Sequence, residues 1–226
     1  MNRHPGSYRR RRATAPYSRA FHVALPALLA GLLAAAVPAA ARNPEILAFG
    51  DSLTSGYGLP PDNSFPARLE AKLRDEGITA RVVNAGVAGD TTAGGLARLD
   101  KALADKPDLV ILELGANDAL RAIDPPAVRA NLEKMIAKVQ ASGAKLLLAG
   151  MKAPPNWGEE YQRDFERIYP ELAEAHGVPL YPFFLEGVAM DAQLNQQDGL
   201  HPNERGVAAM VDRIAPLVAR LIGGKS

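Results

Sequence analysis

The segment 109-LVILELGAND-118 contains an apolar run, with Glu113 as its one polar residue, that leads directly into a Gly-Ala-Asn-Asp turn. The segment 46-ILAFGDSL-53 shows the same arrangement earlier in the chain. An apolar run without alternation is typical of a strand buried on both faces of a parallel sheet. Each turn then lies at the carboxyl end of its strand, where open parallel sheets bind their ligands. The two segments therefore predict a parallel sheet with a site at one edge.

Short apolar runs and longer amphipathic segments alternate through residues 42–226. The runs predict strands at 46–49, 80–83, 109–114, 146–149 and 179–184. Apolar residues at helical spacing predict helices at 65–74, 96–103, 127–139, 161–172 and 207–222. Such alternation indicates βαβ units. We therefore expect a single three-layer α/β/α domain whose five-stranded, mostly parallel sheet has flavodoxin-like topology.

Residues 1–41 have the three parts of a secretory signal peptide. Four arginines at 9–12 precede an apolar run at 20–37, and the small residues Ala39, Ala40 and Ala41 follow. The alternative is a retained membrane anchor, but Pro26 interrupts a run of about 18 residues, and a spanning helix needs about 20. We expect cleavage near Ala41, a mature domain at 42–226, and a periplasmic or secreted protein without stable membrane insertion.

The composition excludes several classes of function. The chain has no cysteine, which excludes disulfides, thiolate metal sites and a cysteine nucleophile. Residues 1–41 contain six arginines and no acid, so 42–226 carries 20 basic and 25 acidic residues. A mildly acidic domain lacks the basic surface that nucleic-acid binding needs. No zinc-binding H-E-x-x-H, G-x-G-x-x-G or Walker A motif is present, so we expect neither a metal nor a cofactor.

Ser52, Asp198 and His201 are the candidate catalytic residues. Ser52 follows the first predicted strand, and His201 lies three residues after Asp198 in a loop bounded by glycine and proline. A D-x-x-H turn can bring the carboxylate to one imidazole nitrogen and leave the other facing the serine. The structural alternatives are a helix cap for Ser52 and a turn for Asp198. His176 ends a predicted helix, where a structural role suffices.

Four sequence blocks carry a resemblance to a known family. They are GDSL at 50–53, Gly86, GAND at 115–118 and DGLHPN at 198–203. In this order they resemble the SGNH (GDSL) hydrolases, and NAGVAGDTTAGGLARL and YPFFLEGV resemble the bacterial periplasmic acyl thioesterase I / lysophospholipase L1 / arylesterase group. The resemblance implies an oxyanion hole formed by the Ser52 and Gly86 backbone N–H groups and the Asn117 side chain. Asp51 and Asp118 are expected to have structural roles.

The resemblance also implies a serine esterase or thioesterase that hydrolyses aryl esters, acyl thioesters or lysophospholipids through an acyl-Ser52 intermediate. The loops after the third and fourth strands supply the candidate substrate-binding residues Ala119, Leu120, Met151, Pro154 and Trp157. Trp157 could equally pack its loop onto the domain. The alternatives are a carbohydrate acetylesterase and a non-catalytic periplasmic binding module. The expected partner is a small-molecule ester or thioester, and the expected state is a monomer.

Overall fold

A five-stranded sheet forms the centre of the protein in a computed structural model, which describes residues 42–223. The predicted signal peptide lies outside the described residues. The strand order is β2-β1-β3-β4-β5, and every neighbouring pair is parallel. This is the flavodoxin-like order 2-1-3-4-5, which places its ligand site near the switch point between β1 and β3. The predicted fold class is confirmed, with a sheet that is parallel throughout.

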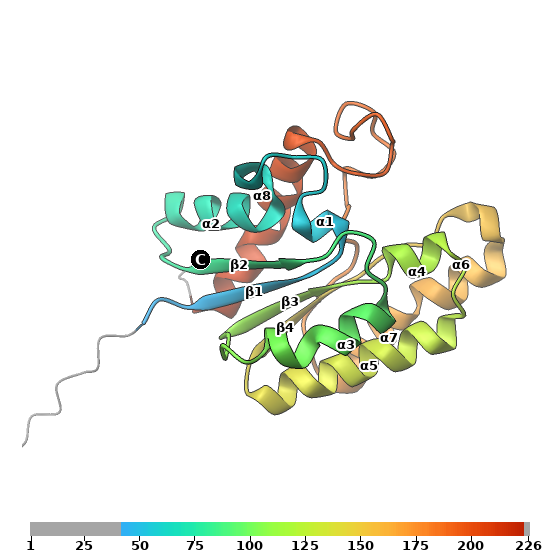
Figure 1. Cartoon of the computed structure of the whole chain (residues 1–226), viewed down its shortest axis with the longest axis horizontal. Coiled ribbons are helices and arrows are strands. Elements are labelled where there is room, and N and C mark those ends of the chain that lie inside the picture. Colours follow the sequence, from blue (N-terminus) through green and yellow to red (C-terminus); the bar gives the residue numbers. More distant parts are fainter. Residues whose placement is uncertain (1–41, 224–226) are drawn as a thin grey trace, which may run out of the picture. The chain divides into compact units, whose positions relative to one another are not determined.

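The strands are short and helices cover both faces of the sheet. The strands are β1 (Glu45–Gly50), β2 (Arg81–Gly86), β3 (Leu109–Glu113), β4 (Lys145–Ala149) and β5 (Leu180–Tyr181). The longer helices are α2 (Phe65–Asp75), α3 (Thr92–Ala102), α5 (Pro125–Ser142), α6 (Glu159–Glu166), α7 (Ile168–His176) and α8 (Glu204–Leu221). Helices α2 and α8 cover one face, and α3, α5 and α7 cover the other (Figure 1).

Short elements gather at the carboxyl ends of the strands. Helix α1 (Ser52–Ser55) follows β1, and α4 (Ala116–Leu120) follows β3. The 3₁₀ turns η1 (Pro61–Asn63) and η2 (Pro155–Trp157) lie in loops. Figure 1 shows α1 and α4 at one end of the sheet, with the long segment that precedes α8 rising beside them. The central strands β1 and β3 are almost fully buried, so this end is held by a rigid core.

Three predicted elements have different bounds in the structure. Strand β2 continues through Gly86, which pairs with Gly50, so it extends three residues beyond its predicted end at residue 83. Strand β5 has only two residues, because Pro182 has no N–H with which to extend the ladder. The predicted helix at 161–172 is two helices, because Pro170 cannot donate the helical hydrogen bond to Glu166. Among residues 42–223, no helix is both long and apolar enough to cross a membrane.

Candidate active site

Helix α1 presents Ser52 at the end of β1. Asp51 caps this helix, because its Oδ1 accepts a hydrogen bond from the Leu53 N–H at 2.9 Å. Ser52 is therefore the first helical residue rather than the cap, and within residues 42–223 its own N–H donates to no acceptor. Gly56 ends the helix with φ of 78°, a conformation that favours glycine. The single turn leaves the Ser52 hydroxyl and N–H at the surface of the cavity described below.

Ser52, His201 and Asp198 form a continuous hydrogen-bonded chain. His201 Nε2 lies 2.9 Å from Ser52 Oγ, and His201 Nδ1 lies 2.7 Å from Asp198 Oδ2. The other oxygen of Asp198 accepts the N–H groups of Leu200 and His201. Asp198 therefore shapes the turn and contacts the imidazole at the same time, as both interpretations of this residue require. The structure thus brings the three predicted catalytic residues together.

The Asp198 carboxylate remains charged over a wide pH range. The hydrogen bond from the His201 N–H is the largest cause, followed by the contact with the His201 side chain, and together they lower the pKa of Asp198 to about 2. This carboxyl is exposed to solvent over 39% of its side chain. An ionised partner fixes the Nδ1–H tautomer of the imidazole, which leaves Nε2 free to accept the serine proton.

The loop that carries His201 is anchored by side chains that the sequence did not single out. Asn203 Oδ1 caps α8 by accepting the N–H groups of Arg205 and Gly206, and its Nδ2 donates to two loop carbonyls. Gln196 donates to the Tyr57 carbonyl, and the Tyr57 ring packs 4.7 Å from the His201 ring, centre to centre. The Tyr57 ring thus contacts the imidazole directly, and the other hydrogen bonds fix the loop that carries it. Asn203 belongs to the DGLHPN block, so its position was visible although its role was not.

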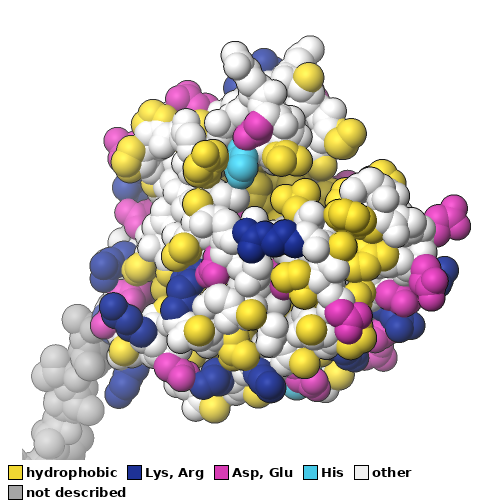
Figure 2. All heavy atoms as spheres, turned by 45° about the vertical axis from the view of Figure 1, so that its right-hand side comes forward, with side chains coloured by type: hydrophobic (Ala, Val, Ile, Leu, Met, Phe, Trp, Pro, Cys, Tyr) yellow, Lys and Arg dark blue, Asp and Glu magenta, His cyan; other side chains and the backbone are white. Residues whose placement is uncertain are grey.

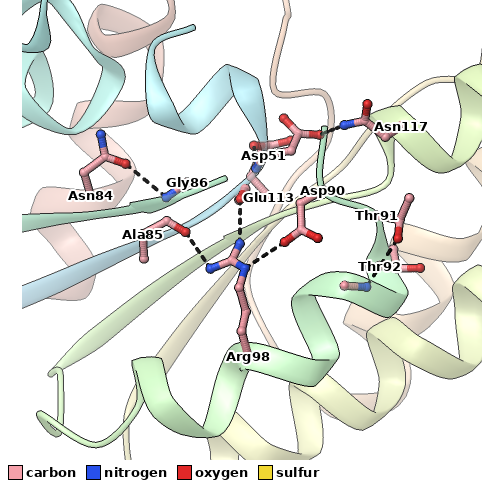
Figure 3. A network of polar contacts seen from close by, with 12 residues as sticks. Asp51, Asn84, Ala85, Gly86, Asp90, Thr91, Thr92, Arg98, Glu113 and Asn117 are labelled. Atoms are coloured by element: carbon pink, nitrogen blue, oxygen red, sulfur yellow. Dashed lines mark hydrogen bonds and ion pairs between the residues drawn. The ribbon is translucent and has the colours of Figure 1, made fainter. Parts of the chain in front are cut away.

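Asn117 lies on α4 beside the nucleophile. Its Nδ2 donates to Asp51 Oδ2 at 3.1 Å, and its side chain lines the same cavity as Ser52 (Figure 3). One amide hydrogen is thereby used for orientation, and the second is available for a bound oxygen. Asp118 is buried and accepts both the N–H and the hydroxyl of Thr92. It holds α3 against α4 and takes no part in the hydrogen-bonded chain.

Gly86 at the end of β2 and Gly89 in the loop after it differ in what their backbone N–H groups do. The Gly86 N–H donates to Asn84 Oδ1 at 3.0 Å, so this predicted oxyanion donor has an acceptor within its own strand (Figure 3). A Cβ at Gly86 would lie 2.3 Å from the Ser55 nitrogen, which shows that this glycine packs beneath α1. Gly89 has φ of 79°, and its N–H donates to no acceptor among residues 42–223. Arg121 holds this peptide by donating to the Gly89 carbonyl at 3.0 Å.

An apolar cavity of about 380 Å³ opens beside Ser52 and His201. One wall comes from α4 and the loop after β4, and the other comes from the segment between β5 and α8. Figure 2 shows mostly hydrophobic side chains around this hollow. Its size and character are those of a site for a small molecule. No group of three histidine or acidic side chains in the described part could hold a metal ion.

Three of the five predicted substrate-binding residues line the cavity. Leu120, Met151 and Pro154 do so, whereas Ala119 and Trp157 are not among the lining residues. The Trp157 indole instead donates to the Ala119 carbonyl at 2.9 Å, which joins the loop after β4 to α4. The wall formed by the segment between β5 and α8 was not predicted from the sequence. Its apolar residues are Phe183, Leu185, Ala189, Met190 and Leu200. Its signal was the apolar YPFFLEGV stretch, whose first four residues were predicted to be part of a strand and not of a substrate site.

A serine, a histidine and a carboxylate joined in this way at the ligand end of a flavodoxin-like sheet define a serine hydrolase. The comparisons agree with this class, since residues 48–209 match the GDSL-like Lipase/Acylhydrolase family. The chain belongs to this family and is an ester hydrolase.

Relatives and a solved structure cover most of the chain. An arylesterase of Vibrio mimicus is 44% identical over 165 residues, which are 73% of this chain and 82% of the relative. Thioesterase 1/protease 1/lysophospholipase L1 of Escherichia coli is 38% identical over 188 residues, which are 83% and 89% of the two chains. The crystal structure of TesA is 42% identical, has a TM-score of 0.75, and matches over 78% of this chain and 99% of its own.

Proposed function

We propose that this enzyme hydrolyses carboxylic esters and thioesters with apolar acyl or aryl groups through an acyl-Ser52 intermediate. The hydrogen-bonded chain from Ser52 through His201 to Asp198, at the edge of an apolar cavity, is the observation that carries the proposal. A serine hydroxyl is a weak nucleophile unless a base removes its proton. The geometry supplies that base at 2.9 Å and an anion that orients it.

The reaction has two steps that use the same imidazole. First, Ser52 Oγ attacks the acyl carbon while His201 Nε2 takes the hydroxyl proton, and the C–O or C–S bond to the leaving group breaks as His201 returns the proton to it. Then His201 takes a proton from water, the resulting hydroxide attacks the acyl-serine carbon, and the bond between this carbon and Ser52 Oγ breaks as His201 returns the proton to Oγ, which releases the carboxylic acid. Asp198 stabilises the imidazolium in both steps without itself accepting the proton.

The proposed oxyanion donors are the Ser52 N–H, the Asn117 amide and the Gly89 N–H. Negative charge develops on the carbonyl oxygen in each tetrahedral intermediate, and preorganised donors stabilise it. The amides of Ser52 and Gly89 have no acceptor within residues 42–223, which leaves both available. We propose Gly89 in place of Gly86, because the Gly86 N–H is already used by Asn84.

The cavity supports a substrate with an apolar acyl group. Both walls are built mainly from aliphatic and aromatic side chains, so burying an acyl chain there is favoured by the hydrophobic effect. The names of the relatives include an arylesterase and a thioesterase/lysophospholipase, which supports both oxygen esters and thioesters. The open cavity sets no sharp limit on the leaving group.

Hydrolysis of a 4-nitrophenyl ester series from acetate to palmitate, with the wild-type protein and Ser52→Ala, tests the proposal. We expect turnover that depends on Ser52 and is fastest for an acyl chain longer than acetyl. Equal turnover by the two proteins would overturn the mechanism. Ser52-dependent turnover confined to acetate would instead favour a carbohydrate acetylesterase.

We further propose that residues 1–41 are a signal peptide, that the hydrolase domain is 42–226, and that the enzyme acts in the periplasm or outside the cell. The arginine cluster, the apolar run and the Ala-Ala-Ala sequence support this assignment. Amino-terminal sequencing of the exported protein should give Arg42 as the first residue. Size-exclusion chromatography with light scattering should give the mass of a monomer.

A further inference from the structure

A buried carboxyl group that the proposed reaction does not use lies directly behind the nucleophile. Glu113 ends β3 and is completely buried. Its Oε2 accepts the Asp51 N–H at 3.2 Å and the Thr54 hydroxyl at 2.7 Å, and both donors flank Ser52. Its Oε1 is buried and has no such donor in the structure. A buried oxygen in this position requires an explanation, because burying an unpaired polar atom is unfavourable.

The space for this carboxyl is built into the GDSL sequence. A Cβ on Gly50 would lie 2.4 Å from Glu113 Oε2 and 2.1 Å from the Thr54 hydroxyl oxygen. No larger residue fits at this position while Glu113 and Thr54 keep their places. The glycine at position 50 thus makes room for the glutamate rather than for a substrate.

The side chain of Asp51 meets that of Glu113. Asp51 is also buried, its N–H donates to Glu113 Oε2, and the two carboxyl groups lie close enough for each to change the pKa of the other. Asp51 Oδ1 accepts the Leu53 N–H, and Asp51 Oδ2 accepts the Asn117 amide. Two ionised carboxylates buried side by side repel each other and cannot share a hydrogen bond, so protonation of one of them is favoured.

The surroundings assign the proton to Glu113. Asp51 has two N–H donors on its oxygens and is near His201, which favours its charged form, whereas Glu113 is fully buried beside a negative neighbour. Burial raises the pKa of Asp51 to about 6 and raises the pKa of Glu113 well above its ordinary range, to which the charge of Asp51 adds. These contacts favour a pair that holds a single proton, on Glu113.

The other charged and titratable groups around the pair do not supply a partner for an ionised Glu113. Arg98 on α3 uses its guanidinium on the Gly50 and Ala85 carbonyls and on Asp90 (Figure 3). Tyr169 on α7 donates to the Leu114 carbonyl, and burial raises its pKa, so it is neutral. Asp118 on α4 brings no positive charge, and its carboxyl group accepts the N–H and the hydroxyl of Thr92.

We propose that Glu113 is a positioning residue whose protonated carboxyl donates a hydrogen bond to Asp51 and thereby orients the Asn117 amide beside Ser52. The Oε1 atom is the donor, which explains why no donor faces it. Asp51, held in this way, orients Asn117 by accepting its amide N–H at Oδ2, and it orients the first turn of α1 by accepting the Leu53 N–H at Oδ1. This inference rests on the proposed function, because it assigns the Asn117 amide to the oxyanion.

Substitution by glutamine and by methionine separates this role from a merely structural one. Glu113→Gln keeps the shape, its amide can donate to Asp51, and its oxygen can accept the same two donors. We expect it to retain at least about a third of the wild-type kcat. Glu113→Met fills the same space but can neither donate nor accept. We expect its kcat on 4-nitrophenyl butyrate to fall about 100-fold with KM within about twofold, as for loss of an oxyanion donor.

Thr54→Val is the matched control. It removes a hydrogen bond to the same buried carboxyl, but at Oε2 rather than at the proposed donor Oε1. We expect its kcat to stay within about threefold of the wild-type value. Circular dichroism identifies any variant that does not fold, and if Glu113→Met is one of these, the pH profile of Glu113→Gln decides the question.

The pH dependence of kcat gives the readout that packing alone would not change. In the wild type, loss of the Glu113 proton at alkaline pH places two negative charges side by side and removes the hydrogen bond to Asp51. Because glutamine does not titrate, the alkaline fall in kcat should be present in the wild type and absent in Glu113→Gln. The proposal would be overturned if kcat of the wild type and kcat of Glu113→Gln fell in the same way at alkaline pH. It would also be overturned if Glu113→Gln lost as much kcat as Glu113→Met. Neither outcome would affect the Ser52 dependence that tests the proposed function.

Discussion

Replacing Asp198 with asparagine should impair catalysis while leaving its turn intact. Asparagine Oδ1 can still accept the N–H groups of Leu200 and His201, which fixes the amide orientation. Its NH₂ group then lies where Asp198 Oδ2 now lies, 2.7 Å from His201 Nδ1. Two donors cannot face each other there, so the imidazole must place its proton on Nε2. In that tautomer Nε2 cannot accept the Ser52 proton.

The size of the loss follows from the exposure of this carboxylate. In chymotrypsin-like proteases, whose aspartate is buried, the same change lowers kcat about 10⁴-fold. Here 39% of the Asp198 side chain is exposed, so water screens its charge and can partly replace it. We therefore expect kcat to fall by about 10²- to 10³-fold, which corresponds to about 3–4 kcal/mol of transition-state stabilisation.

The assay is hydrolysis of 4-nitrophenyl butyrate, with Asp198→Ala and His201→Ala measured beside Asp198→Asn. Alanine leaves space for a water molecule that can accept from Nδ1, so Asp198→Ala should be no slower than Asp198→Asn if the loop remains folded. Both should be faster than His201→Ala, which removes the base itself. A kcat for Asp198→Asn within about threefold of the wild-type value would refute the assignment of Asp198.

Three further predictions concern the loops and the buried pair. Asn203→Ala removes a helix cap and two loop contacts, so urea denaturation should show a stability loss of about 2 kcal/mol. Gly89→Ala should lower kcat at least about tenfold with unchanged KM in steady-state assays, because its positive φ becomes strained and the amide moves. As pH rises above the ordinary pKa of a glutamate, the free energy of unfolding of Glu113→Gln should increase relative to that of the wild type by about 1.4 kcal/mol per pH unit, as thermal denaturation can measure. The reason is the raised pKa of Glu113, because ionisation of this buried carboxyl opposes folding.

The central strands and the catalytic residues were predictable from the sequence. Strands β1 and β3 are buried on both faces, so apolar residues dominate their sequences, and parallel pairing brings the turns after them together. Ser52 and His201 follow from the same logic, because residues 42–226 contain few histidines and only His201 lies in a turn with an aspartate three residues earlier.

The oxyanion loop and the second cavity wall were not predictable by these signals. Gly86 and Gly89 lie three residues apart, and their local sequences do not show which backbone N–H is available to the oxyanion. Only the structure shows that the Gly86 N–H already donates to Asn84 Oδ1. Strand β2 is an edge strand with exposed positions, so its end does not coincide with the end of an apolar run. The wall from 183 to 190 has little regular structure, and its apolar residues resembled a strand in the sequence.

Direct detection of the acyl-enzyme is the measurement that tests the account most directly. The protein is mixed with 4-nitrophenyl butyrate, quenched in acid during turnover, digested and analysed by peptide mass spectrometry. We expect one butyryl group on the peptide that contains Ser52 and none in the Ser52→Ala protein. Turnover without an adduct on Ser52, or a butyryl group on another residue that persists in Ser52→Ala with activity retained, would contradict the account.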